Sequence, residues 1–202
     1  MTYDQLGSPA SPAPHRRSFL TGFGRVTLSA TAIALLAGQE GLVLGRAAHA
    51  AHAAHAATPN SDIAILNAAL GAEQEAVAAY QVGAESGLLK KPVLDLAVQF
   101  QGHHKEHIDA LAKTVKKLGG TPVEPPKSFN FPIEKLKSQA DVLAFAAGLE
   151  KGAVSAYLGA VPILKDRELA KVAASILGDE AMHWAVLRHA LGENPVPGAF
   201  VS

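Results

Sequence analysis

The sequence predicts an all-α protein, a four-helix bundle in which two helical hairpins are joined by a long crossover. Apolar residues recur at alternating steps of three and four in four separate segments, which is the spacing of a helix with one buried face. Short links join these segments into two pairs, whereas a stretch over 121–137 that contains four prolines separates the pairs. The third observation is that the two pairs repeat each other at a nearly fixed offset.

The first 56 residues are predicted to be an export signal that precedes a bundle domain over 57–202. Arg16 and Arg17 precede a mildly apolar run over 26–43 and Ala-x-Ala sites near 48–50. This order resembles the bacterial twin-arginine signal, which implies the twin-arginine export machinery as a partner and a periplasmic or extracellular destination. The alternative is a transmembrane anchor, because the run is almost long enough to span a bilayer. Glu40 inside the run and the cleavage sites favour removal of the segment.

The composition limits the classes of function. The chain has 18 basic and 18 acidic side chains and no basic block after residue 56, so nucleic acid is not an expected partner. Because cysteine is absent, no disulfide framework exists, although the export signal implies an oxidising destination. His49, His52 and His55 lie in an Ala-rich repeat, and we interpret them as the low-complexity end of the signal rather than as a metal-binding tract.

The first helix is expected over about residues 62–88. Its apolar stripe includes one charged residue, Glu73, which should therefore face the core. Glu75 and Glu85 fall on other faces and are expected to be solvated. The stripe consists of Leu66, Leu70, Glu73, Val77, Tyr80 and Ala84.

The second helix is expected to start at Pro92, after a short link at Lys90-Lys91 that makes the first two helices an antiparallel hairpin. It should end at Gly119-Gly120, because glycine favours the left-handed conformation that terminates helices. His104 and His107 lie on its buried face, three residues apart.

The second hairpin begins after the crossover. Ser138 starts a capping-box-like sequence, and the helix that follows has Glu150 in its apolar stripe, as Glu73 is in the first helix. Asp166 is a plausible N-cap for the last helix, whose apolar stripe contains Glu180 and His183. A buried carboxylate without a partner costs several kcal/mol, so these stripes need compensating groups, and a metal ion is one of the few that suffice.

The two hairpins look duplicated. The first and third helices align at an offset of 77 residues, which pairs Glu73 with Glu150 and Tyr80 with Tyr157. The second and fourth helices align at an offset of 76, which pairs His104 with Glu180 and His107 with His183. All four helices therefore present polar residues at one height in the core.

A bundle with one long crossover, a Glu from each of two helices and a Glu-x-x-His element from the others is the dinuclear metal arrangement of ferritin-like proteins. The chain resembles the exported bacterial ferritin-like domain proteins over essentially the whole of residues 57–202. The resemblance implies a metal site in the core of a ferritin-like four-helix bundle. Its ligands would be Glu73, His104, His107, Glu150, Glu180 and His183.

The second helix departs from this pattern, because His104 stands where a glutamate is expected. In such sites that glutamate often bridges two ions, whereas a neutral imidazole binds through one nitrogen. Three carboxylates also balance less of the charge of two divalent ions than four would. The sequence therefore leaves open a mononuclear, an asymmetric or a dinuclear site, with His103 as a supporting residue or a spare ligand.

Two functions are compatible with these observations. The leading hypothesis is an exported metalloprotein that binds one or two transition-metal ions, iron or manganese before zinc, with redox chemistry on oxygen or peroxide. The alternative is a non-catalytic scaffold or stress-protection module, in which the core Glu and His side chains form a metal-free network of salt bridges. Iron storage in a cage is disfavoured by the export signal. The sequence leaves enzyme status open, allows a homodimer and predicts no stable membrane anchor.

Five further side chains have expected positions. Tyr80 and Tyr157 should pack in the core with their hydroxyl groups hydrogen-bonded. Trp184 and Met182 should pack between helices, whereas His189 should lie on the surface.

Overall fold

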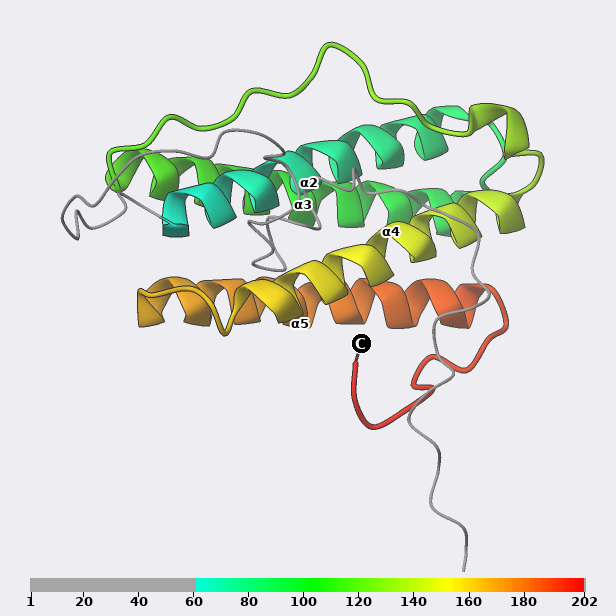
Figure 1. The fold of residues 1–202 in the computed structure, drawn as a ribbon. Coiled ribbons are helices and arrows are strands. Elements are labelled where there is room, and N and C mark those ends of the chain that lie inside the picture. Colours follow the sequence, from blue (N-terminus) through cyan, green and yellow to red (C-terminus); the bar gives the residue numbers. More distant parts are fainter. Residues whose placement is uncertain (1–60, 202) are drawn as a thin grey trace, which may run out of the picture.

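The computed structural model describes residues 61–201, and it confirms an all-α four-helix bundle. Its helices are α2 (Ser61–Glu85), α3 (Lys91–Lys117), α4 (Gln139–Ala160) and α5 (Arg167–Ala190). In Figure 1, α2 and α3 form one antiparallel hairpin, α4 and α5 form the other, and the crossover runs the length of the bundle between them. The predicted export signal over 1–56 lies outside the described residues.

The ends of the first hairpin helices follow from local chemistry. Helix α2 stops three residues before the predicted end at 88, because Ser86 folds back to donate to the carbonyl of Gly83 (2.6 Å) and Gly87 adopts a φ of 70°. Helix α3 has a proline in its first turn and ends before Gly119, whose φ is 82°, as predicted. The next residue, Gly120, must also be small, since a Cβ there would lie 2.8 Å from Cγ2 of Ile63.

Both predicted caps of the second hairpin are confirmed. The hydroxyl of Ser138 accepts a hydrogen bond from the backbone N–H of Asp141 at the start of α4. The carboxylate of Asp166 accepts from the N–H groups of Glu168 and Leu169 at the start of α5. These bonds satisfy backbone donors that have no partner inside a helix.

The crossover is attached to the bundle by side chains of α2. Asn67 donates to the carbonyl of Thr121 (3.0 Å) and accepts from the N–H of Val123 (2.9 Å). Gln74 donates to the carbonyl of Val123 (3.0 Å). The crossover also contains one short 3-10 turn, η1 (Ile133–Lys135), which the sequence did not predict.

The core has two apolar clusters with a polar layer between them. One cluster contains Leu66, Leu70, Leu111 and Ile176, and the other contains Phe100 and Leu143. Each helix contributes apolar residues to both clusters. Its Glu or His residues of the polar layer lie, in sequence, between the residues that it gives to one cluster and those that it gives to the other. Burial of each large apolar side chain is worth about 2 kcal/mol, so the clusters hold the helices together on either side of the polar layer.

Among the described helices, none is both long and apolar enough to cross a membrane.

A buried carboxylate joins the start of α2 to the link before α5. Asp62 is only 6% exposed, and its two oxygens accept hydrogen bonds from the backbone N–H groups of Lys165 (3.1 Å) and Asp166 (3.0 Å). Hydrogen bonds to a charged group contribute more to stability than bonds between neutral groups. Asp62 thus ties the two hairpins at one end of the bundle.

We predict that Asp62→Ala lowers the free energy of unfolding by about 2 kcal/mol, because it leaves two backbone donors without their charged acceptor. Urea unfolding followed by circular dichroism measures this. Asp109→Ala, at an exposed position of α3, is the matched control and should change the free energy by less than about 0.5 kcal/mol. Equal effects of the two substitutions would contradict the role given to Asp62.

Candidate metal centre

The structure brings all six predicted site residues into the polar layer. Glu73 comes from α2, Glu150 from α4, and the other four come from α3 and α5. Five of the six are at most 2% exposed, and the side chain of His107 is 14% exposed. The helical period that placed these residues on buried faces is therefore confirmed for five of them, and His107 lies partly exposed at the edge of the layer.

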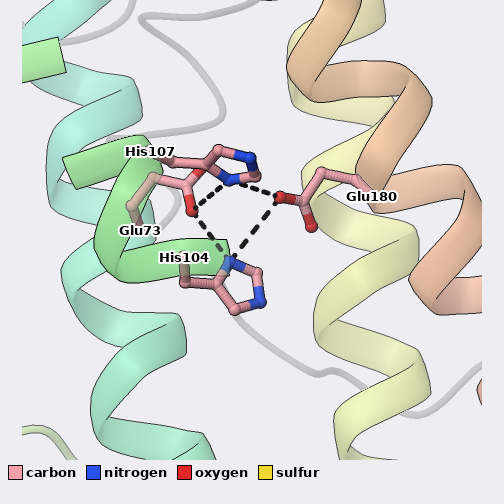
Figure 2. Close-up of side chains that lie close together, drawn as sticks. All are labelled: Glu73, His104, His107 and Glu180. Carbon is pink, nitrogen blue, oxygen red and sulfur yellow. Dashed lines mark hydrogen bonds and ion pairs between the residues drawn. The ribbon is translucent and has the colours of Figure 1, made fainter. Parts of the chain in front are cut away.

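One group of donors consists of Glu73, His104, His107 and Glu180, which Figure 2 shows converging from three helices. The Nδ1 atom of His104 lies 2.8 Å from Oε2 of Glu73. The Nδ1 atom of His107 lies 3.2 Å from Oε1 of Glu180 and 3.4 Å from Oε2 of Glu73. One donor atom from each residue lies within 4.8 Å of all the others.

A second group overlaps the first, because it shares His104 and Glu180 and adds Glu150 and His183. The Nε2 atom of His104 lies 3.3 Å from Oε1 of Glu150, and Nδ1 of His183 lies 3.5 Å from the same oxygen. His104 therefore faces inward and directs its two ring nitrogens at different carboxylates. The one residue that departs from the ferritin-like pattern occupies the middle of the site.

Two tyrosines hold the carboxylates in place, and each does so across the hairpins. The hydroxyl of Tyr157 on α4 donates to Oε1 of Glu73 on α2 (2.6 Å), and that of Tyr80 on α2 donates to Oε1 of Glu150 on α4. Burial, followed by the adjacent carboxylate, raises the pKa of both phenols well above the usual value, so they remain donors. The prediction of hydrogen-bonded core tyrosines is confirmed.

The charges of this layer balance in part without a metal. Burial opposes charge on His104, but its hydrogen bonds with Glu150 and Glu73 outweigh burial and raise its pKa to about 10. Burial likewise disfavours charge on Glu73 and Glu150. The pKa of Glu73 is nevertheless held below the usual value by His104 and His107, and that of Glu150 by Glu180 and then by His104 and His183. Glu180 differs, because burial and then the adjacent Glu150 raise its pKa to about 12.

The donors fit a metal ion. Both carboxylate oxygens of Glu180 and Nδ1 of His183 are buried without a hydrogen-bond partner, and such atoms are rare in folded proteins. The whole set consists of carboxylate oxygens and imidazole nitrogens, which suit iron, manganese and zinc. The Glu and His cluster can therefore hold a metal, and its unpartnered atoms are those that coordination would satisfy.

Two residues beside the core complete the cluster. His103 and Asp179, on α3 and α5, lie on its outer side, where Asp179 contacts both His107 and His183. The sequence indicated His103 as a supporting or spare residue but did not identify Asp179. The signal that could have found Asp179 is the 76-residue offset, which aligns it with His103.

Other expectations had mixed outcomes. Met182 is 61% exposed, so its predicted packing between helices is wrong, whereas Trp184 packs against the apolar cluster that contains Phe100. His189 is exposed, as predicted. Glu75 was expected to be solvated, but it is half-buried in the wall of a small cavity beside the core.

Comparison with known proteins agrees with the fold. A model of the ferritin-like domain matches residues 61–193. A conserved hypothetical protein from Mycobacterium tuberculosis is 22% identical with a TM-score of 0.59, over 68% of this chain and 94% of that chain. A structure from Bacillus anthracis str. Ames is described as ferritin like, diiron-carboxylate proteins. It is 22% identical with a TM-score of 0.56, and the match covers 64% of this chain and 94% of that chain. No curated protein matches.

We predict that the metal-free protein loses stability as the pH rises from 7 to 9. Folding raises the pKa values of His104 and Glu180, so the native state keeps protons that the unfolded chain has already released in this range. Each group should then lower the free energy of unfolding by about 1 kcal/mol per pH unit. The window opens near the ordinary histidine value of 6.5 and closes for His104 near 10.

Urea unfolding of chelator-treated protein at several pH values measures this slope. His104→Gln should reduce the slope, and His189→Gln, at an exposed position of α5, should leave it unchanged. A free energy of unfolding that stays constant from pH 7 to 9 would show that neither proton is retained.

Proposed function

Because the chain belongs to the ferritin-like domain family, we propose that its core binds one or two transition-metal ions, iron or manganese before zinc. The observation that supports this most directly is the carboxylate of Glu180, which is fully buried between the two donor groups. Its oxygens face histidine nitrogens at 3.2–3.9 Å but make no hydrogen bond. If the polar layer were only a network of hydrogen bonds, those two oxygens would be expected to have donors. A cation satisfies them together with the unpartnered Nδ1 of His183.

The two donor groups suggest how ions would be distributed. Glu73 and His107 would belong to one ion, and Glu150 and His183 to the other, with Glu180 shared. Three carboxylates leave two divalent ions with a net positive charge, which favours a single or asymmetric occupancy over a symmetric pair. His104 supports this asymmetry, because it stands between Glu73 and Glu150 and adds no negative charge.

We propose that the bound metal supports redox chemistry on oxygen or peroxide. Iron or manganese would supply the electron transfer, and the chain supplies position, charge and limited access. The phenols of Tyr80 and Tyr157 orient Glu150 and Glu73, and the apolar clusters on both sides of the layer exclude bulk water.

A cavity supports the choice of a small substrate. It has a volume of about 20 Å³, enough for roughly one water-sized molecule. Its lining residues include Glu73, His104 and Glu150 together with alanines of α2 and α4, and almost all of its accessible surface is apolar. A molecule as small as dioxygen or peroxide would fit in this space beside the core.

The metal-free scaffold remains the second candidate, and one observation favours it. His104 lies within 2.8 Å of Glu73 and 3.3 Å of Glu150, so a protonated imidazole neutralises part of the layer by itself. In the metal-free scaffold, Glu180 stays protonated and the polar layer only helps to hold the helices together. Metal analysis separates the two functions.

We predict that protein purified from its native host contains at least about one equivalent of a transition metal, and that Glu180→Ala lowers this content at least tenfold. Bound metal should also stabilise the fold by about 3 kcal/mol at a hundredfold excess over its dissociation constant. Plasma mass spectrometry and thermal unfolding measure the two effects. Glu85→Ala, at an exposed position of α2, is the control.

Metal below about a tenth of an equivalent in the parent protein would reject the proposal in favour of the scaffold. The redox part has its own readout, the uptake of oxygen after ferrous iron is added. The parent protein should consume oxygen faster than Glu180→Ala does, and equal rates would reject the redox chemistry while leaving metal binding intact.

We also propose that the protein is exported by the twin-arginine machinery to the periplasm or the cell exterior. The proposal rests on the sequence over 1–56 and on the fit of a folded metal site with a route that carries folded proteins.

We predict that replacing Arg16 and Arg17 by lysine leaves the protein in the cytoplasm, because the paired arginines are the signal that the route reads. Cell fractionation measures this. Lys113→Arg, at an exposed position of α3, is the control. Export of the double variant at the parent level would contradict the proposed route.

A further inference from the structure

Three side chains on the outer side of the core converge on one point, and the proposed core site does not use that point. They are His103 on α3 and Asp179 and His183 on α5. His103 and Asp179 are themselves 76 residues apart, so they occupy equivalent positions in the two duplicated hairpins. His183 belongs to both places through different atoms, because its Nδ1 faces the core and its Nε2 faces outward.

The distances among the three donor atoms are short and similar. Nδ1 of His103 lies 2.9 Å from Nε2 of His183 and 3.3 Å from Oδ2 of Asp179. Nε2 of His183 lies 3.2 Å from that same oxygen. Two ligands of a tetrahedral zinc ion, with bonds of about 2.0–2.1 Å, stand about 3.3–3.4 Å apart. The triangle is therefore close in size to one face of a zinc coordination shell.

Hydrogen bonds alone do not account for this triangle. Each ring nitrogen carries at most one hydrogen, and the carboxylate oxygen of an ionised Asp carries none. If both nitrogens donate to Asp179, two N–H groups face each other across 2.9 Å. If only one of the two ring nitrogens carries a hydrogen, the lone pair of the other nitrogen points at the lone pairs of the Asp179 oxygen, and the two repel each other. A cation at the centre makes all three approaches favourable at once.

The triangle is also held in place and open to solvent on one side. The ring of Phe100 stacks on His183 with centroids 4.0 Å apart, which fixes the orientation of the imidazole. The side chains of His103 and Asp179 are 36% and 23% exposed, so an ion can enter without unfolding the bundle. Nε2 of His107 lies 3.5 Å from Oδ2 of Asp179 and borders the same position.

We infer that His103, Asp179 and His183 form an outer binding site for a zinc-type divalent cation, separate from the core. Two imidazoles and one carboxylate, with a fourth position open to water, are a donor set typical of zinc. This site goes beyond the proposed function, because it requires neither an occupied core nor redox chemistry. Only His183 contributes to both the core site and the outer site, through opposite ring nitrogens. A neutral imidazole offers one nitrogen to a metal, so ions at both sites at once would require His183 to lose its second ring proton.

Equilibrium dialysis against Zn²⁺ at low micromolar free concentration, with zinc counted by plasma mass spectrometry, tests this site. Every protein in the series, the parent included, has His49, His52 and His55 replaced by alanine, so that this tract adds no zinc. His103→Ala and Asp179→Ala remove one outer donor each, and both positions are partly exposed, which limits damage to the fold. Circular dichroism verifies the helical content of each variant.

We expect His103→Ala and Asp179→Ala each to bind about one zinc equivalent fewer than the parent, since loss of one of three ligands weakens binding at least tenfold. His189→Ala, which removes an exposed histidine of the same helix α5, should bind as much zinc as the parent. Glu73→Gln alters only the core and should keep the outer ion.

Unchanged zinc content in both His103→Ala and Asp179→Ala would overturn the inference, and the two residues would then serve only to support the core histidines. A parent protein that binds one zinc, lost in His103→Ala but kept in Glu73→Gln, would instead support the outer site while counting against the core site. The two proposals therefore fail separately.

Discussion

The burial of three carboxylates in the middle of an apolar bundle is the constraint on which the rest of this structure depends. Glu73, Glu150 and Glu180 are each at most 2% exposed, and an isolated buried carboxylate would cost several kcal/mol. The compensating groups come from every helix, since a tyrosine hydroxyl and an imidazole approach both Glu73 and Glu150, and His183 of α5 also approaches Glu150. The helices must therefore meet in one register, because a slip by one turn would separate each carboxylate from its donors.

The internal duplication explains how this register is achieved with few interactions. Tyr80 bonds to Glu150 and Tyr157 bonds to Glu73, so each hairpin supplies the donor for the carboxylate of the other. These reciprocal bonds connect α2 with α4, the helices that are joined only through the long crossover and α3. The layer thus ties the hairpins together at mid-height, the apolar clusters pack on either side of it, and Asp62 ties them at one end.

Much of the fold and of the site could be predicted from the sequence, because both depend on helical periodicity. The caps at Ser138 and Asp166 and the inward direction of all six donors follow from local rules that act within one helix. Asp179 was missed because it lies one residue, about 100°, from Glu180, and its role depends on how α3 and α5 are rotated against each other. Met182 was misplaced for the same reason, since periodicity does not say which flank of a helix has a neighbour.

The replacement of the expected glutamate by His104 changes how far the fold depends on a metal. A fourth carboxyl at this position would face Glu73 and Glu150, and the repulsion would have to be relieved by a proton, as at Glu180, or by a cation. His104 instead takes a proton and hydrogen-bonds to both, so the layer contains its own positive charge. This arrangement would allow the helices to assemble without a metal, and a metal that bound afterwards would do so in exchange for protons. The single departure from the ferritin-like pattern therefore lowers the negative charge available to a metal and makes folding less dependent on one.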